Sequence, residues 1–102
     1  MPRRACKKDA NQDEIADAFR RLGWDVIDTH EHAQYTPGWP DLVAIRPDAV
    51  VPIEVKNKRG RLTEDEEVFA ALHPDWAPVI VRTVDDVVEL DAMVREGEVR
   101  RE

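Results

Sequence analysis

The chain has 102 residues, of which 42% are hydrophobic and 36% charged, a composition that predicts a single soluble globular domain with a modest core. It has no apolar run of membrane-spanning length and no signal-peptide core, and its only cysteine, Cys6, excludes an internal disulfide and a cysteine-rich zinc site, so we expect a cytoplasmic protein. The net charge of −7 argues against simple non-specific DNA binding, because such binding needs Lys and Arg side chains that neutralise phosphates.

The first half of the predicted fold is a helix followed by a strand. Residues 1–8 are a basic N-terminal arm that we expect to be flexible. A helix is predicted over residues 9–22, because four apolar residues recur on one face at helical spacing: Ile15, Ala18, Phe19 and Leu22. Gly23 ends this helix, a strand is predicted over residues 24–29, and residues 30–38 form a polar loop.

A β-hairpin is predicted at the centre of the chain. Its two strands and the turn between them are Leu42–Ile45, Val50–Lys56 and Arg46–Ala49. A two-residue loop that begins at Pro47 would place Asp41 directly across from Glu54, with Cβ atoms about 4.5–5.5 Å apart. Pro47 cannot supply the positive φ of the favoured two-residue turns, so a four-residue loop with Asp41 opposite Lys56 stays open.

A strand and two helices complete the predicted fold. A capping box of Thr63 with Glu66 begins the first helix, and Thr83-x-x-Asp86 caps the second. The first helix ends near His73 and the second at Gly97, with a charged and flexible tail over residues 97–102. Between the helices, a Val-Ile-Val run predicts a buried strand over residues 77–82. The order is αβββαβα, which predicts one α/β domain with a mixed sheet flanked by helices.

Two acids and a lysine would share one face of the hairpin in either register. Side chains alternate along a strand, so Glu54 and Lys56 point the same way, and Asp41 joins them. Directly opposed acids repel each other, and an ionised acid in an apolar strand is costly unless a cation compensates it. Oxygen ligands favour Mg²⁺ or Mn²⁺. The alternative is that Asp41 ends a loop and that Glu54 and Lys56 form an exposed ion pair on an edge strand.

Pro40-Asp41, twelve intervening residues and then Glu54-Val55-Lys56 form an ordered motif. An acidic first helix around Glu14 precedes it, and Gly60-Arg61-Leu62-Thr63 leads into a helix after it. In these pieces, over roughly residues 10 to 95, the chain resembles the PD-(D/E)XK nuclease superfamily, and in particular its VRR-NUC branch. One position departs from that pattern, since Glu66 stands where members usually carry Gln.

The resemblance implies a restriction-endonuclease-like core and a Mg²⁺ site at which Mn²⁺ substitutes. The implied metal ligands are Glu14, Asp41, Glu54 and the Val55 carbonyl, and the implied catalytic residues are Asp41, Glu54 and Lys56. From the pattern alone, Glu14 could equally close a capping box with Asn11, and the resemblance favours metal binding. The basic residues expected to grip phosphates are Lys58, Arg59 and Arg61. The acids of residues 64–67 are expected to be solvated, because acids in a first helical turn favour the helix dipole.

We therefore expect a Mg²⁺-dependent endonuclease acting on DNA, with branched or junction DNA, such as a Holliday junction, as its substrate by resemblance. A domain this small spans little DNA, so a homodimer with paired sites is expected. Two alternatives stay open: a nucleic-acid-binding module that keeps the fold without turnover, and an acidic protein-interaction domain. The Glu54-Val55-Lys56 motif argues against the first, and only the net charge favours the second.

Overall fold

The computed structural model describes residues 11–100, apart from the side chains of residues 98–100. The predicted order of elements is confirmed, with two short 3₁₀ helices, η1 and η2, added to it. The elements are α1 (Gln12–Arg21), β1 (Asp25–Asp28), η1 (His30–Gln34), β2 (Leu42–Arg46), β3 (Ala49–Val55), α2 (Glu64–Leu72), η2 (Pro74–Trp76), β4 (Val79–Val81) and α3 (Val84–Arg100). None of the helices within this described range is long and apolar enough to span a bilayer. The predicted basic arm over residues 1–8 lies outside it.

The four strands form one mixed sheet in the order β1-β2-β3-β4. The first three are antiparallel, and β4 is parallel to β3. In the hairpin Leu42 pairs with Ile53 and Arg46 with Ala49, so the two-residue loop is confirmed and the four-residue alternative is wrong. No non-glycine residue in the described range has a positive φ, so this loop forms without the turn geometry that Pro47 excludes. The apolar faces of the two strands specify this register, because a slip of one residue would expose them.

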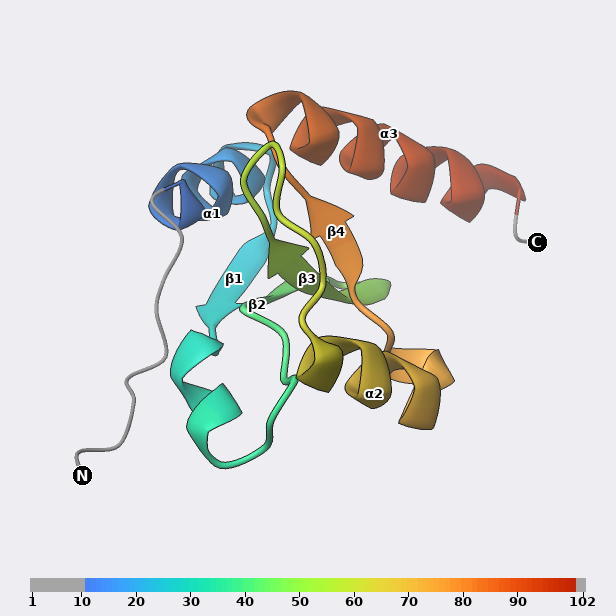
Figure 1. The fold of residues 1–102 in the computed structure, drawn as a ribbon. Coiled ribbons are helices and arrows are strands. Elements are labelled where there is room, and N and C mark those ends of the chain that lie inside the picture. The colour runs from blue at the N-terminus through green and yellow to red at the C-terminus, as the bar shows by residue number, and fades with distance from the viewer. Residues whose placement is uncertain (1–10, 101–102) are drawn as a thin grey trace.

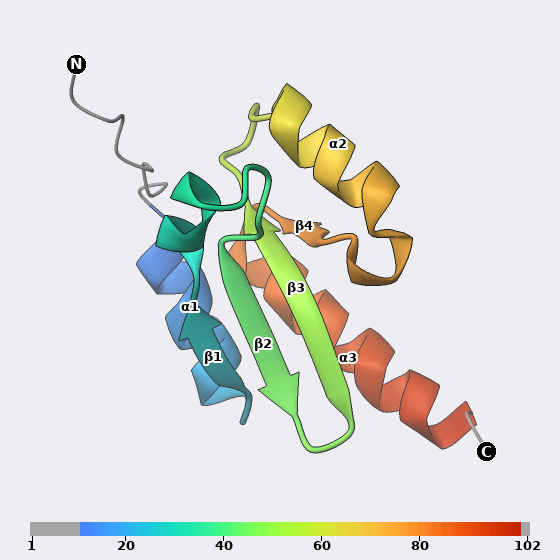
Figure 2. The same ribbon diagram turned by 90° about the horizontal axis from the view of Figure 1, so that it is seen from below.

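The helices lie on both sides of the sheet. α1 and α3 lie side by side over one face, and α2 lies on the other side, near the end at which β3 finishes (Figures 1 and 2). The main core fills the space between the sheet, α1 and α3, and its largest members are Ile15, Phe19, Trp24, Leu42, Ile53, Val55, Val81, Val87 and Leu90. The apolar stripe predicted for α1 is confirmed, since Ile15, Ala18 and Phe19 are all buried.

An aromatic cluster attaches α2 to its face of the sheet. The ring of Trp39 packs against Phe69 of α2 and against Trp76, with centroid distances of 5.8 and 6.4 Å. Gly38 permits this close approach: its φ is +88°, and a Cβ at that position would collide with the carbonyl oxygen of Asp65. The contact places the start of β2 beside the first turn of α2.

Two local predictions are wrong. The sequence predicts a buried strand over residues 77–82, but β4 is an edge strand of three residues in which Val79 and Ile80 are 38% and 37% exposed. Its apolar content cannot show that only one side of it has a neighbouring strand. The sequence also predicts a helix end at Gly97, whereas α3 continues to Arg100, because an interior glycine costs a helix only about 1 kcal/mol.

Candidate active site

The residues of the predicted motif lie at one end of the sheet. There β2 begins, β3 ends, and α2 begins nearby (Figure 2). The paired register of the hairpin ends at Leu42 and Ile53. The N–H of Asp41 donates to the carbonyl of Ile53 at 3.0 Å, one residue out of that register, so the prediction that Asp41 pairs directly with Glu54 is wrong. Asp41 Oδ2 in turn accepts a hydrogen bond from the N–H of Val55 at 2.8 Å, so the backbone of β3 fixes this carboxylate. The metal-binding role of the Val55 carbonyl stays a prediction.

Glu54 is a buried carboxyl on a central strand. β3 lies between β2 and β4, so the alternative of an exposed ion pair on an edge strand is wrong. Glu54 is 1% exposed, and its Oε1 has no hydrogen-bond partner among the described residues. A buried carboxyl oxygen without a partner is costly. A proton or a cation bound to this oxygen would therefore offset the cost of its burial.

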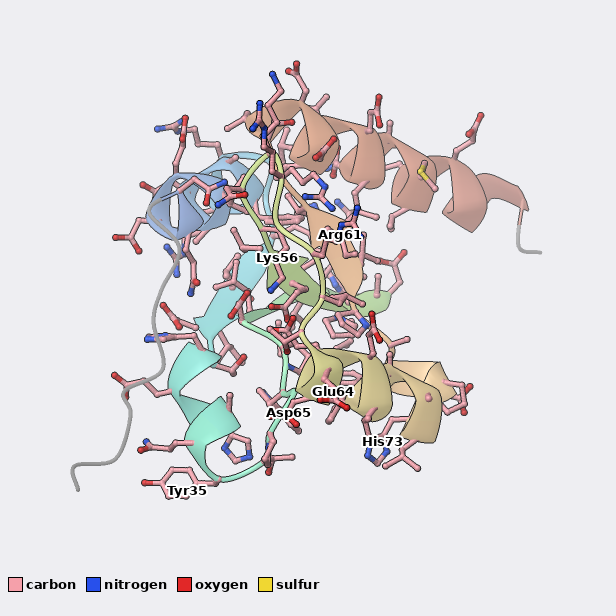
Figure 3. All side chains as sticks on the ribbon, viewed as in Figure 1. Tyr35, Lys56, Arg61, Glu64, Asp65 and His73 are labelled. Atoms are coloured by element: carbon pink, nitrogen blue, oxygen red, sulfur yellow. The ribbon has the colours of Figure 1, made fainter. Side chains whose placement is uncertain are left out.

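Lys56 brings a positive charge to the buried carboxyls. Its Nζ lies 2.8 Å from Glu66 Oε1 and 3.6 Å from Glu54 Oε2. Burial disfavours the charged form, but the carboxylates of Glu66, Glu54 and Asp41 outweigh it and raise the pKa of Lys56. Lys56 is therefore a cation at neutral pH. Figure 3 shows it near the centre of the view, above the first turn of α2.

Glu66 belongs to the site, so the prediction that all acids of residues 64–67 are solvated is wrong for this one. Its side chain is 15% exposed. The predicted capping box is confirmed: Thr63 N–H donates to Glu66 Oε1 at 2.8 Å, and Glu66 N–H donates to Thr63 Oγ1 at 3.2 Å. The same Oε1 also binds Lys56. The capping box was the available signal, because it turns this carboxylate back towards the segment that follows β3.

Burial and neighbouring charges give the three carboxyls different ionisation states. Burial, with the nearby carboxyls of Glu66 and Asp41, raises the pKa of Glu54 from 4.5 to about 10. Burial also raises the pKa of Asp41, against the hydrogen bonds that favour its charge. Burial opposes ionisation of Glu66 as well, but its bonds to Glu54, Lys56 and Thr63 lower its pKa. Without a bound cation, Glu54 is thus neutral at pH 7 and Glu66 is an ion paired with Lys56.

Glu14 is not brought to this cluster. It is exposed on α1, and α1 covers the opposite face of the sheet from α2 (Figure 1). It lines a surface groove with Arg82 and the first residues of α3 instead. The capping box with Asn11 does not form either, because Asn11 makes no side-chain cap and its Nδ2 donates to the Arg82 carbonyl at 3.0 Å. No contact among the described residues places Glu14 at this cluster, so its role as a metal ligand stays a prediction.

The basic loop after β3 is exposed and is held in place by Arg82. Its three predicted phosphate-binding residues, Lys58, Arg59 and Arg61, are all exposed. Arg82 Nη1 donates to the carbonyls of Asn57 and Gly60, both at 2.7 Å. These bonds order the loop backbone next to the end of β3. Arg82 was not among the predicted site residues, since a basic residue after a strand carries no signal of a contact 25 residues away.

A second polar group lies at the same end of the sheet. Asp28, the last residue of β1, accepts a hydrogen bond from Gln12 Nε2 at 3.3 Å, and its Oδ1 lies 2.6 Å from His30 Nδ1. Gln12 is 1% exposed and was missed, although it extends the apolar stripe of α1 by one turn at helical spacing. The neighbouring Thr29 donates its N–H to the Asp41 carbonyl at 2.8 Å, which connects this group to the start of β2.

The donors of the site suit a hard cation, but an ammonium contacts them instead. Asp41, Glu54 and Glu66 offer only oxygen ligands, which Mg²⁺ and Mn²⁺ prefer. Within the part of the chain that the structure describes, no three His, Cys, Asp or Glu side chains form a ready-made metal centre. The Nζ of Lys56 contacts both Glu54 and Glu66. A divalent ion therefore fits the chemistry of this donor set, provided that Lys56 moves.

Comparison of the chain with family models, with curated proteins and with solved structures gives no match. The small α/β domain with a mixed sheet is shown by the structure itself. The superfamily resemblance and the restriction-endonuclease-like core stay predictions.

Proposed function

We propose that this chain is a Mg²⁺-dependent endonuclease that hydrolyses DNA phosphodiester bonds. The observation that carries the proposal is the carboxyl of Glu54, which is 1% exposed on a central strand, has an oxygen without a partner in the described range, and lies beside Asp41 and Lys56. Stability alone does not favour such a group, because apolar residues of similar volume serve as well or better in a core. Buried acids with a lysine and perturbed ionisation are typical of a functional site.

In this proposal Asp41 and Glu54 hold the ion, with Glu14 and the Val55 carbonyl as the further predicted ligands. A bound Mg²⁺ would polarise the scissile phosphate and lower the pKa of the attacking water. Lys56 donates hydrogen bonds to the phosphate oxygens, where negative charge develops. Hydrolysis forms a bond between phosphorus and the water oxygen and breaks the bond to one sugar oxygen. One hydrogen of the water ends on the sugar hydroxyl and the other on the new terminal phosphate.

The basic loop supplies the DNA contacts in this proposal. The net charge of −7 opposes DNA binding over most of the surface, whereas Lys58, Arg59 and Arg61 place three exposed cations directly after the catalytic strand. Branched or junction DNA is the proposed substrate on the strength of the resemblance. A homodimer with paired sites belongs to the proposal, because one domain of 102 residues covers little DNA.

A panel of labelled DNA substrates tests the proposal. Duplex, single-strand, flap and four-way-junction DNA are each incubated with the whole chain in Mg²⁺, Mn²⁺, Ca²⁺ or EDTA. We expect cleavage in Mg²⁺ or Mn²⁺, fastest on a branched substrate, and none in EDTA or in Ca²⁺, whose looser coordination suits binding more than chemistry. Binding without cleavage in every cation would favour the non-catalytic module, and no binding at all would favour the protein-interaction domain. Full cleavage in EDTA would remove the metal from the proposal.

Replacing Lys58, Arg59 and Arg61 together by alanine should flatten the salt dependence of DNA binding. Each phosphate contact releases roughly 0.9 counterion on duplex DNA, so the slope of log K against log salt should fall by about 2–3. The affinity is measured over a salt series in Ca²⁺, so that nothing is cut. The variant should fold normally, because exposed loop charges contribute little to stability.

The matched control for this test replaces Arg20 and Arg21, two exposed basic residues at the end of α1, by alanine. We expect the control to keep the wild-type slope. An unchanged slope in the loop variant, or an equally large change in the control, would place the DNA elsewhere on the surface.

A further inference from the structure

We propose that Asp41, Glu54 and Glu66 form one site for a divalent cation, and that the ammonium of Lys56 fills this site in the cation-free protein. The inference rests on the proposed nuclease function and deepens it. The third carboxylate then comes from the first turn of α2, and the predicted ligand Glu14 on α1 is not needed.

Contacts place Glu66, and not Glu14, with the other two acids. Glu66 Oε1 lies 2.8 Å from Lys56 Nζ, and the same Nζ lies 3.6 Å from Glu54 Oε2. Asp41 lies next to Glu54, because the two carboxyls are within hydrogen-bond reach of each other and Asp41 is also bonded to the backbone of β3. The side chain of Glu66 is 15% exposed, whereas Glu14 is exposed in a groove beside Arg82. One ammonium therefore contacts two carboxyls and lies close to the third.

The ammonium leaves the site incomplete. Its distance of 3.6 Å to Glu54 Oε2 is longer than the roughly 2.7–2.9 Å of a charged hydrogen bond. Oε1 of the same carboxyl, buried within a residue that is 1% exposed, has no partner among the described residues. A lysine ammonium has three donors, whereas a divalent ion takes about six oxygen ligands and can bind carboxylate oxygens that the ammonium does not reach. The site thus has a buried carboxyl oxygen, Glu54 Oε1, that the ammonium does not use and that a cation of higher charge could bind.

The charges of the cluster point to a divalent ion as well. When all three carboxyls are ionised, the ammonium of Lys56 compensates one of their three negative charges, whereas a divalent cation in its place compensates two. A buried cluster with uncompensated charge is strongly destabilised. An amide at position 66 would remove one of these charges, so the glutamate makes the cluster more dependent on a cation.

Exchange of the two cations would release Lys56 for the substrate. The lysine side chain is a flexible stem of four carbons, so its ammonium can leave the carboxyls and reach a phosphate oxygen nearby. Glu66 stays in place during this exchange, because the capping box with Thr63 fixes its carboxylate at the start of α2. Cation binding and the availability of Lys56 are thereby coupled.

Calorimetric titration of the whole chain with Mn²⁺ tests the inference without any cleavage. Glu66→Gln removes the charge but keeps the capping box, because the amide oxygen can still accept from the N–H of Thr63. We expect this variant to bind Mn²⁺ about tenfold more weakly or worse, and the exposed control Glu64→Gln to bind as the wild type does. Lys56→Met should bind Mn²⁺ about tenfold more tightly, since no ammonium competes within 4 Å of the carboxyls. The exposed control Arg21→Met should stay near the wild type.

The outcomes separate this inference from the proposed function. Wild-type affinity in Glu66→Gln, with binding lost in Asp41→Asn, would overturn the role of Glu66 and leave the nuclease proposal intact. Weaker binding in Glu14→Gln but not in Glu66→Gln would return the third ligand to α1. Unchanged affinity in Lys56→Met would overturn the exchange. No Mn²⁺ binding by the wild type, together with cleavage in EDTA, would refute the metal-dependent nuclease itself.

Discussion

Asp41→Asn and Glu54→Gln should each reduce DNA cleavage by about a hundredfold to a thousandfold, while DNA binding survives or tightens. Both changes keep the shape of the side chain, and the amide oxygen at position 41 can still accept the hydrogen bond from Val55 N–H. What they remove is a negative charge beside the bound cation, and losses of this size are usual for an electrostatic group at a reacting centre. Affinity for DNA should not fall, because one repulsion between a carboxylate and a phosphate is gone.

Lys56→Met should reduce cleavage by a similar factor, with only a small loss of affinity, because its role in the reaction is to stabilise charge on the phosphate. The rate is measured in single turnover with Mg²⁺, and the affinity in Ca²⁺. Asp25→Asn on β1 and Glu64→Gln on α2 are the matched controls, since both residues are exposed and should leave the rate unchanged. A wild-type rate in Lys56→Met would show that its assigned role is wrong, and a wild-type rate in the acid variants would place the site elsewhere.

The cation-free protein should lose stability as the pH rises from about 5 to about 9, and Glu54→Gln should remove most of this loss. The cause is the pKa of Glu54, which burial raises from 4.5 to about 10. Across this range the folded protein keeps a proton that the unfolded chain has released, so unfolding releases a proton and a higher pH favours the unfolded state. The raised pKa of Asp41 acts in the same direction. The lowered pKa of Glu66 matters only as the pH falls below its ordinary value of 4.5.

Urea unfolding in EDTA between pH 5 and pH 9 measures this effect. One proton changes the free energy of unfolding by roughly 1 kcal/mol per pH unit, so at pH 9 Glu54→Gln should be more stable than the wild type by more than about 1 kcal/mol. Glu64→Gln, which changes an exposed acid of α2, should follow the wild type. Addition of Mg²⁺ should stabilise the wild type at high pH and release a proton, because a metal-bound carboxylate must be ionised. A parallel decline of the wild type and Glu54→Gln would show that another group titrates.

Much of the candidate site could be predicted from the sequence because its motif lies in one hairpin. Alternation along β3 places Glu54 and Lys56 on one face, and the two-residue loop brings Asp41 to the same end of the hairpin, although the paired register ends at Leu42 and Ile53. The hydrogen bond from Val55 N–H to Asp41 could not be foreseen from the pattern, since it depends on the side-chain conformation at position 41. The capping box of Thr63 and Glu66 was predicted correctly, but its contact with Lys56 was not.

The remaining members of the site are far from the motif in the chain. Arg82 holds the basic loop from the end of β4, and Gln12 reaches Asp28 from the opposite face of the sheet. Glu14, in contrast, was predicted for the site but does not lie in it. Its place at the rim of an apolar stripe is compatible both with a role as a ligand and with solvent exposure. Only the packing of α1 against the sheet and α3 shows that its neighbours are Arg82 and the start of α3.

The sequence by itself determined the order of elements, the capping box of Thr63 with Glu66 and the shared face of Glu54 and Lys56, because each of these depends on residues close together in the chain. It left two hairpin registers open, and the structure decided between them. The tertiary structure alone decided that β3 is a central strand and β4 an edge, and that α1 and α2 lie on opposite sides of the sheet. Because β3 is a central strand, Glu54 is buried, and because α2 lies near the end of β3, Glu66 contacts Lys56. Burial and ionisation depend on neighbours that are distant in sequence. A Val-rich strand has the same local sequence pattern whether it is central or at an edge, and so does an acidic helical turn whether it is buried or exposed.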